Sequence, residues 1–124
     1  MHRGNDLQNK RVVVVGGSSG IGFAVAQQAA SEGAKVVIAS SSHERVQKAI
    51  ESVGGEVEGQ AVDVSDERAV QTFFTKLDAF DHLVFTTGDS LRVHDLATTD
   101  LKHARRASEL RYWAALAAVK YGHP

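Results

Sequence analysis

The sequence has no cysteine, one proline, one methionine and one tryptophan among its 124 residues. Without cysteine there can be no disulfide framework and no thiolate chemistry. No apolar run approaches the ~18 residues that a membrane-spanning helix requires, and the polar N-terminal stretch lacks the apolar segment of a signal peptide. We therefore expect a cytoplasmic protein without a membrane partner.

An excess of charge of one sign is also absent. Fourteen Lys and Arg residues nearly balance fifteen Asp and Glu residues, so the formal net charge is −1. This balance provides no overall field that would attract nucleic acid, and we expect no such partner. The six histidines are scattered, with no cluster at the spacing of metal ligands, so no metal site is predicted.

Two kinds of segment alternate along the chain. Short runs rich in β-branched residues predict strands. These runs are Arg11–Val15, Lys35–Ala39, Val57–Val64 and His82–Thr86. Between them, apolar residues recur at helical spacing, and the first two helical patterns end at Gly33 and Gly54. Ser42 and Ser65 stand where the N-caps of the second and third helices are expected.

The alternation itself predicts the fold class. Strands separated by helices of ten or more residues are typical of βαβ units with right-handed crossovers and a parallel sheet. A further segment from Thr99 to Tyr121, rich in Ala, Leu and Arg, predicts a final helix. We expect an α/β fold with strand order 3-2-1-4 and helices on both faces, forming a single domain over residues 1–124.

The strongest chemical signal is a glycine-rich loop between the first strand and the first helix. A pyrophosphate needs backbone N–H groups without intervening side chains and the positive end of a helix dipole. Gly16 would allow the tight turn, Gly20 would let the backbone approach the phosphates, and Gly22 would let the helix pack on the sheet. The candidate cofactor-binding residues of this loop are Gly16, Ser18, Ser19, Gly20, Ile21 and Gly22.

A glycine-rich turn without a ligand is the alternative interpretation of this loop. Its position directly after a strand and at the head of a βαβ run favours a nucleotide site in a Rossmann-type sheet. A P-loop is excluded, because no Lys-Ser or Lys-Thr pair follows the glycines.

The spacing G-x-x-x-G-x-G of these glycines resembles the short-chain dehydrogenase/reductase family rather than the long-chain dehydrogenases. Asp63 and Val64, at the end of the third strand, resemble the family's Asp-Val pair beside the adenine ring. Thr86, Thr87 and Gly88 stand in the place of the family's Asn-Asn-Ala-Gly, of which only the glycine remains. Asp63 capping a turn, and an ordinary strand end at the threonines, are the plainer readings of these positions.

The end of the second strand bears on the choice of dinucleotide. In this fold an acidic residue about 20 residues past the glycines binds the adenosine ribose and marks NAD. Here Ser40, Ser41 and Ser42 follow the strand and no carboxylate stands there. The three hydroxyls, together with Arg45 in the next helix, can bind a 2′-phosphate. NADP(H) is therefore the expected cofactor and NAD(H) a possible one, while helix capping by Ser42 and a solvated Arg45 are the alternative roles.

The resemblance also implies residues that these 124 positions lack. The family's chemistry, hydride transfer between the nicotinamide and an alcohol or carbonyl carbon, uses a Ser on a fifth strand and a Tyr-x-x-x-Lys on the next helix. Neither Tyr112 nor Tyr121 has lysine four positions later, and Arg111 aligns with an asparagine used by many relatives. We expect the cofactor-binding portion of a reductase, truncated before the fifth strand and catalytically silent alone. A non-catalytic dinucleotide-binding or sensing module, or a fragment with a vestigial site, are the alternatives.

The expected absence of a fifth strand also predicts self-association. The fourth strand, interior in the family fold, would become an edge with unpaired backbone groups. On the final helix Trp113, Leu116 and Val119 would be left uncovered. We expect a homo-oligomer, most simply a twofold dimer, with a monomer whose final helix folds over the open edge as the alternative.

Overall fold

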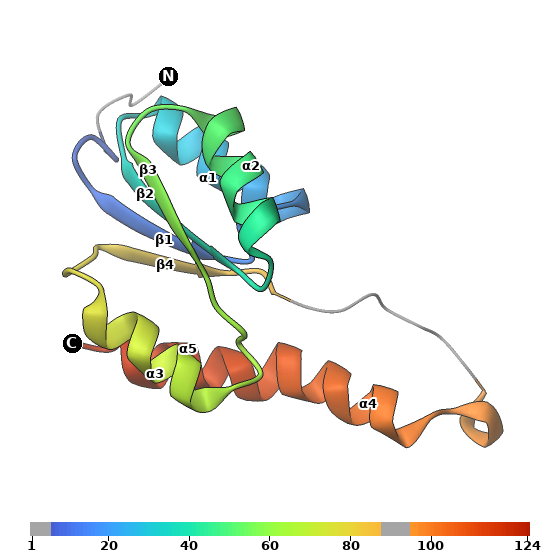
Figure 1. The fold of residues 1–124 in the computed structure, drawn as a ribbon. Helices are drawn as coiled ribbons and strands as arrows, with labels where there is room; N and C mark the ends of the chain where they lie inside the picture. The colour runs from blue at the N-terminus through green and yellow to red at the C-terminus, as the bar shows by residue number, and fades with distance from the viewer. Residues whose placement is uncertain (1–5, 88–94) are drawn as a thin grey trace.

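The computed structural model describes residues 6–87 and 95–124. Its centre is a parallel sheet of four strands in the order β3-β2-β1-β4 (Figure 1), which confirms the predicted order. The strands are β1 (Arg11–Val15), β2 (Lys35–Ser40), β3 (Val57–Ala61) and β4 (His82–Phe85). Val15 is in register with Ala39 on one side and with Phe85 on the other, so the strands end together at one edge of the sheet.

Helices cover both faces of the sheet, as predicted. α1 (Gly20–Ser31) and α2 (His43–Val53) lie on one face, while α3 (Glu67–Lys76) and the C-terminal helix lie on the other (Figure 1). The side chains of β1 alternate between the two cores. Val12 and Val14 pack with the alanines of α1, and Val13 and Val15 pack with the phenylalanines of α3. Because all four valines are buried, each contributes about 1.5–3 kcal/mol from its removal from water.

The C-terminal segment forms one continuous helix with an irregular centre. A 3₁₀ turn, η1 (Leu96–Thr98), precedes α4 (Leu101–Ser108), the π-helical segment η2 (Glu109–Trp113) and α5 (Ala114–Gly122). The single helix predicted over residues 99–121 is therefore confirmed, and the π-helical turn within it is an additional finding. In Figure 1 α5 lies beside α3, whereas α4 projects past the edge at which the strands end.

The helix caps correct one prediction and confirm another. Ser42 accepts a hydrogen bond from the Arg45 N–H at 3.2 Å and caps α2, as expected. Ser65 does not cap α3. Asp66 does so, accepting from the N–H groups of Arg68 and Ala69 at 3.0 and 3.4 Å. A carboxylate at this position also adds a favourable charge at the positive end of the helix, which a serine cannot supply.

The third strand is shorter than predicted. β3 ends at Ala61 rather than Val64, because its neighbour β2 ends at the paired residue Ser40. The last bond of this ladder runs from the Val62 N–H to the Ser40 carbonyl at 2.7 Å. Beyond that bond β2 offers no backbone partner, so the chain leaves the sheet and carries Asp63 and Val64 toward α3. In the part of the chain that the structure describes, no helix is long and apolar enough to cross a membrane.

Candidate functional site

The glycine loop makes its turn through backbone conformations and contacts that require glycine. Gly16 has φ +93°, and a Cβ there would lie 2.7 Å from the Thr86 hydroxyl oxygen. A Cβ on Gly22 would overlap the carbonyl oxygen of Gly16 and lie 2.5 Å from the same hydroxyl. Gly20, with φ +58°, opens α1, and a Cβ there would meet nothing within 4 Å. Gly16 and Gly22 thus fold the loop tightly, while Gly20 lies against open space.

The N-terminus of α1 has no side-chain cap, in contrast to those of α2, α3 and α4. Ser19 occupies the cap position in an extended conformation and makes no side-chain cap hydrogen bond within the described residues, and the first turn holds no acidic residue. By contrast, Ser42, Asp66 and Asp100 each cap the helix that follows them. The backbone N–H groups that begin α1 are therefore available to an anion, which the helix dipole would attract.

A cavity of about 580 Å³ lies at the carboxyl ends of the strands, in front of this helix terminus. Its volume is in the range of small-molecule sites, and its place is where open α/β sheets bind ligands. Residues from the glycine loop, the ends of β2, β3 and β4, and the C-terminal helix form the wall. They are Gly16, Ser18, Ser19, Gly20, Ile21, Gly22, Ser40, Ser41, Arg45, Val62, Asp63, Val64, Thr86, Thr87, Arg106 and Leu110.

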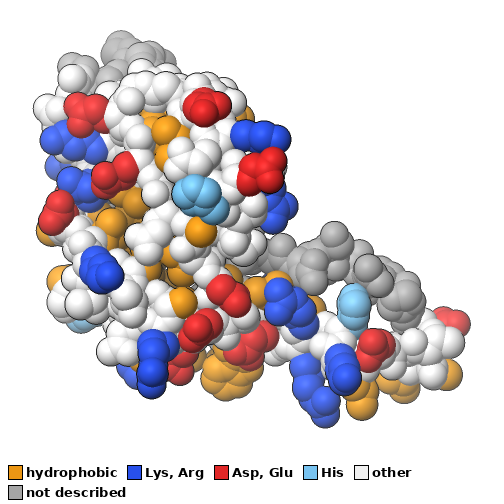
Figure 2. Space-filling view, in the orientation of Figure 1, with side chains coloured by type: hydrophobic (Ala, Val, Ile, Leu, Met, Phe, Trp, Pro, Cys, Tyr) orange, Lys and Arg blue, Asp and Glu red, His pale blue; other side chains and the backbone are white. Residues whose placement is uncertain are grey.

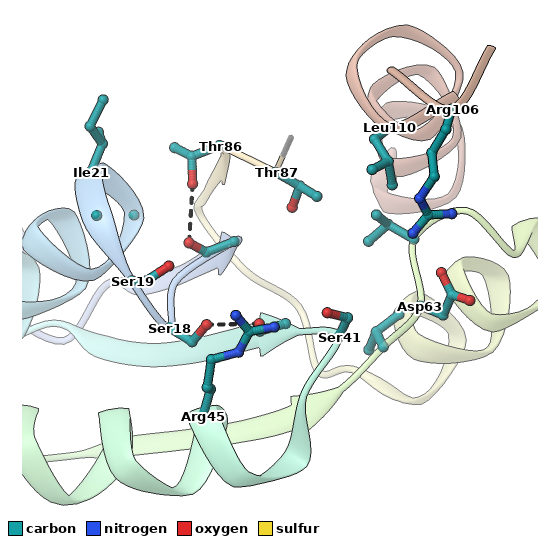
Figure 3. Close-up of a pocket in the computed structure, with 16 residues that line it drawn as sticks. Ser18, Ser19, Ile21, Ser41, Arg45, Asp63, Thr86, Thr87, Arg106 and Leu110 are labelled. Carbon is teal, nitrogen blue, oxygen red and sulfur yellow. Dashed lines mark hydrogen bonds between the residues drawn. The ribbon is translucent and has the colours of Figure 1, made fainter. Parts of the chain in front are cut away.

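The structure brings together nearly all of the candidate residues predicted from the sequence, with two exceptions. Ser42 is outside the cavity wall and serves as the N-cap of α2. Gly88 lies outside the described residues. Ile21 borders the cavity, but its side chain is 76% exposed and points away from the other labelled residues (Figure 3).

Serine and arginine side chains form the part of the wall nearest β2. The hydroxyl oxygens of Ser18 and Ser40 are 2.8 Å apart, which joins the glycine loop to the end of β2. Arg45 extends from α2 toward this pair (Figure 3), and Ser41 lies beside it. Three hydroxyl groups and one guanidinium group thus face a small region with no carboxylate at the strand end, a composition suited to a phosphate group.

Thr86 holds the loop from the opposite side. β4 ends at Phe85, one residue before the predicted end, although the Thr86 N–H still bonds the Val15 carbonyl at 2.9 Å. The Thr86 hydroxyl donates a hydrogen bond shared between the carbonyl oxygen of Gly16, at 3.2 Å (Figure 3), and that of Val15, at 3.3 Å. This residue therefore fixes the turn of the glycine loop through its side chain, and Thr87 adds a second threonine to the cavity wall.

Asp63 occupies the far side of the cavity as a fixed carboxylate. Ser65 donates both its hydroxyl and its N–H to Oδ1, at 2.6 and 3.0 Å. These two bonds, and to a lesser degree the positive charge of Arg106, lower the pKa of Asp63 below its usual value. Asp63 therefore organises a turn through Oδ1, as the plainer interpretation expects, and it also lines the cavity, while its place beside the adenine ring stays a prediction.

Three wall residues were missed by reasoning from the sequence: Val62, Arg106 and Leu110. Val62 is next to the predicted pair Asp63 and Val64 and follows from the early end of β3. Arg106 and Leu110 come from the C-terminal helix, whose placement over the strand ends no local pattern indicates. Their spacing of four residues, which places two side chains on one face of a helix, is the one signal that relates them.

Comparison with known proteins places the chain in a family. A family model described as short chain dehydrogenase matches residues 10–120. The short-chain dehydrogenase/reductase fsr5 of Gibberella fujikuroi is 36% identical, in an alignment covering 92% of this chain and 49% of that protein. For ATR9 of Stachybotrys chlorohalonatus the identity is 33%, with 92% and 50% covered. The solved MalC reductase/Diels-Alderase of Malbranchea aurantiaca superimposes with a TM-score of 0.84 at 28% identity, covering 96% of this chain and 52% of that one.

The chain therefore belongs to the short chain dehydrogenase family. Members of this family bind nicotinamide dinucleotides, and the resemblance inferred from the glycine spacing is confirmed. The chain spans about half the length of the curated relatives it matches. Among the described residues there is no group of three or more His, Cys, Asp or Glu side chains that could hold a metal ion.

Proposed function

We propose that this chain binds NADP(H) in the cavity at the carboxyl ends of its strands, in preference to NAD(H). The observation that carries the proposal is the wall around the end of β2. There Ser40 and Ser41 face the cavity with Arg45, and no carboxylate stands at the position that marks NAD in this fold. A carboxylate would repel a 2′-phosphate, whereas hydroxyl and guanidinium donors bind one.

The remaining wall residues fit the other parts of a dinucleotide. The uncapped start of α1, with Ser18 and Ser19 beside it, would hold the pyrophosphate. There is room for the pyrophosphate beside Gly20, because a Cβ at this position would meet nothing within 4 Å. Asp63 and Val64 would bind the adenine, with the carboxylate accepting from the exocyclic amine. Thr86 would act on the cofactor indirectly, since its hydroxyl is engaged with the loop backbone.

The reaction proposed for the whole protein is the transfer of hydride between the nicotinamide and an alcohol or carbonyl carbon. Bound NADP(H) would supply the hydride chemistry. The MalC protein, to which this chain is similar, is described as a reductase and Diels-Alderase. Proton transfer to the carbonyl oxygen would require a further group, because these 124 residues contain no Tyr-x-x-x-Lys sequence. We therefore propose that residues 1–124 form a single cofactor-binding domain that does not turn over substrate alone.

A non-catalytic dinucleotide-binding or sensing module is the second candidate. The absence of a Tyr-x-x-x-Lys sequence favours this candidate, since neither Tyr112 nor Tyr121 has a lysine four positions later. The two candidates differ in one experiment. A protein that carries this chain together with a fifth strand and its proton donor reduces carbonyl compounds with NADPH if the first is correct, and does not if the second is correct.

We further propose that the chain associates with itself. β4 is an edge strand, so one row of its backbone groups has no partner strand in the described sheet. On the C-terminal helix Trp113, Leu116 and Val119 are 53%, 50% and 60% exposed. Their spacing of three residues places them along one face, and exposed hydrophobic side chains line the lower border of this helix in Figure 2. A twofold dimer would bury this face, the β4 edge or both.

The binding proposal is tested by calorimetric titration of the purified chain with NADPH and with NADH. Tighter binding of NADPH is the expected result. Equal affinities for the two cofactors would contradict the preference, and no binding of either would contradict the function itself.

A further inference from the structure

Arg106 extends over the cavity because the C-terminal helix keeps one face toward the sheet. Leu110, Ala114 and Ala118 follow it at intervals of four residues and are all buried. In a regular α-helix residues four apart drift by about 40° per step, so such a series would turn away from the sheet. The π-helical segment Glu109–Trp113 has more residues per turn and reduces this drift.

Arg106 continues this line of residues into α4, the part of the helix that projects past the strand ends, where its side chain is exposed (Figure 1). The sheet no longer lies beneath it, and its side chain borders the cavity instead. Basic side chains gather over this part of the helix (Figure 2), yet the neighbouring Arg105 is outside the cavity wall. The position of Arg106, rather than the general basic character of α4, directs it to the site.

The surroundings of Arg106 point to a flat base rather than to a phosphate. Val62, Val64 and Leu110, which line the cavity with it, are buried apolar residues at 5%, 7% and 7% exposure. Asp63 faces Arg106 across this region (Figure 3) and is held ionised by Ser65. A phosphate placed here would be repelled by that carboxylate, whereas an aromatic ring with an exocyclic amine would satisfy both the apolar wall and the carboxylate.

We propose that Arg106 is a binding residue for the adenine end of the dinucleotide, where its planar guanidinium binds the face of the base. The inference rests on the proposed cofactor function and adds to it a contact from the C-terminal helix. Arginine suits this role better than lysine, because its planar, weakly hydrated group can both stack on an aromatic ring and bear a positive charge. The two arginines of the cavity wall then differ in function, Arg106 binding the base and Arg45 the 2′-phosphate.

The test compares four variants by titration with NADPH and NADH, after circular dichroism has shown that each is folded. Both cofactors contain adenine, so Arg106→Ala is expected to weaken both by the same factor of about ten. Arg106→Lys keeps the positive charge but loses the planar guanidinium group, so its affinity for both cofactors is expected to be close to that of Arg106→Ala. Arg45→Ala is expected to weaken NADPH alone, and Arg105→Ala, on the same exposed helix, is expected to weaken neither.

A second readout locates the effect on the ligand. Reduced nicotinamide mononucleotide lacks the adenosine half, and its binding, followed by the amide NMR shifts of the labelled protein, is expected to be the same in wild type and Arg106→Ala. If Arg106→Ala binds both dinucleotides as wild type does, loses NADPH alone, or is fully rescued by lysine, the inference is overturned. If the wild-type chain binds neither dinucleotide, the proposed function fails and the inference with it.

Discussion

The hydroxyl oxygens of Ser18 and Ser40 lie 2.8 Å apart, and this contact joins the glycine loop to the carboxyl end of β2. The two residues are 22 positions apart in the sequence. The turn at Gly16 and the parallel pairing of β1 with β2 bring them together at the edge where the strands end. Any charge placed at position 40 would therefore act on both the loop and the region beside Arg45.

The first prediction concerns this position. Ser40→Asp is expected to reverse the cofactor preference, because a carboxylate repels a 2′-phosphate and accepts hydrogen bonds from a free ribose. We expect the affinity for NADPH to fall by about ten- to a hundredfold, equivalent to about 1.4–2.8 kcal/mol, while the affinity for NADH rises. Calorimetric titration with both cofactors measures the change. Ser40→Asn, which is similar in size and uncharged, is the control and should leave the order of preference as in wild type.

The second prediction separates two glycines of the loop. Gly22→Ala forces a methyl group against the Gly16 carbonyl and the Thr86 hydroxyl, so the loop must shift. We expect it to lower the free energy of unfolding by about 2–3 kcal/mol, as overpacking of a dense site does. Gly20→Ala meets no atom within 4 Å and has only the cost of φ +58°, about 1 kcal/mol. Urea denaturation compares the two, and equal destabilisation would refute the proposed tight approach at Gly22.

The third prediction follows from the pKa of Asp63, which the Ser65 hydrogen bonds lower below 3.8. Because the folded protein favours the ionised carboxylate, this interaction stabilises the fold above pH 3.8 and is lost as the pH falls through the lowered pKa. Ser65→Ala should raise the pKa of Asp63, visible in the carboxyl carbon NMR titration. It should also destabilise the protein near neutral pH by about 1 kcal/mol or less, since the site is exposed.

The control for this prediction is Ser65→Thr, which retains the hydroxyl group. In this variant the pKa of Asp63 and the free energy of unfolding should remain near those of the wild type. The difference in stability between wild type and Ser65→Ala should shrink below pH 3.8. A difference that persists unchanged in acid would assign the destabilisation to packing and not to the carboxylate.

The fourth prediction concerns self-association. Leu116→Glu places a charge in the middle of the exposed face formed by Trp113, Leu116 and Val119. If this face is the dimer contact, the dissociation constant should rise at least about thirtyfold, the effect of losing about 2 kcal/mol at an interface. Leu101→Glu, at a somewhat more exposed position at the start of α4, should have little effect. Sedimentation velocity at several concentrations measures both, and a wild-type chain that stays monomeric throughout refutes the dimer.

Much of the fold was predictable because its signals are local. The valines of β1 alternate between two buried cores, and a continuous β-branched run is what a strand covered on both faces requires. The glycine loop was equally predictable, since the turn at Gly16 and the close approach at Gly22 each need a residue without a side chain. The cap of α3 was assigned one residue too early, because Ser65 and Asp66 are both good caps and only the structure shows that Ser65 binds Asp63.

The missed part of the candidate site depends on tertiary packing. The approach of Arg106 to Asp63 depends on where the C-terminal helix crosses the strand ends, on the phase set by its π-helical turn, and on the length of β3. None of these leaves a signal within a short window of sequence. Leu110, Ala114 and Ala118 form a buried face at a spacing of four residues, which Arg106 extends, but in a regular helix that spacing would not stay on one face over so many turns.

The central claim is that the cavity of this chain is an NADP(H) site, and NMR titration of the labelled chain with NADPH tests it most directly. We predict saturable binding of NADPH that is tighter than that of NADH, with the largest amide shifts at Gly16–Gly22, Ser40–Ser42 and Asp63–Val64. Shifts confined to residues outside the cavity wall, or no shifts at cofactor concentrations well above that of the protein, would contradict it.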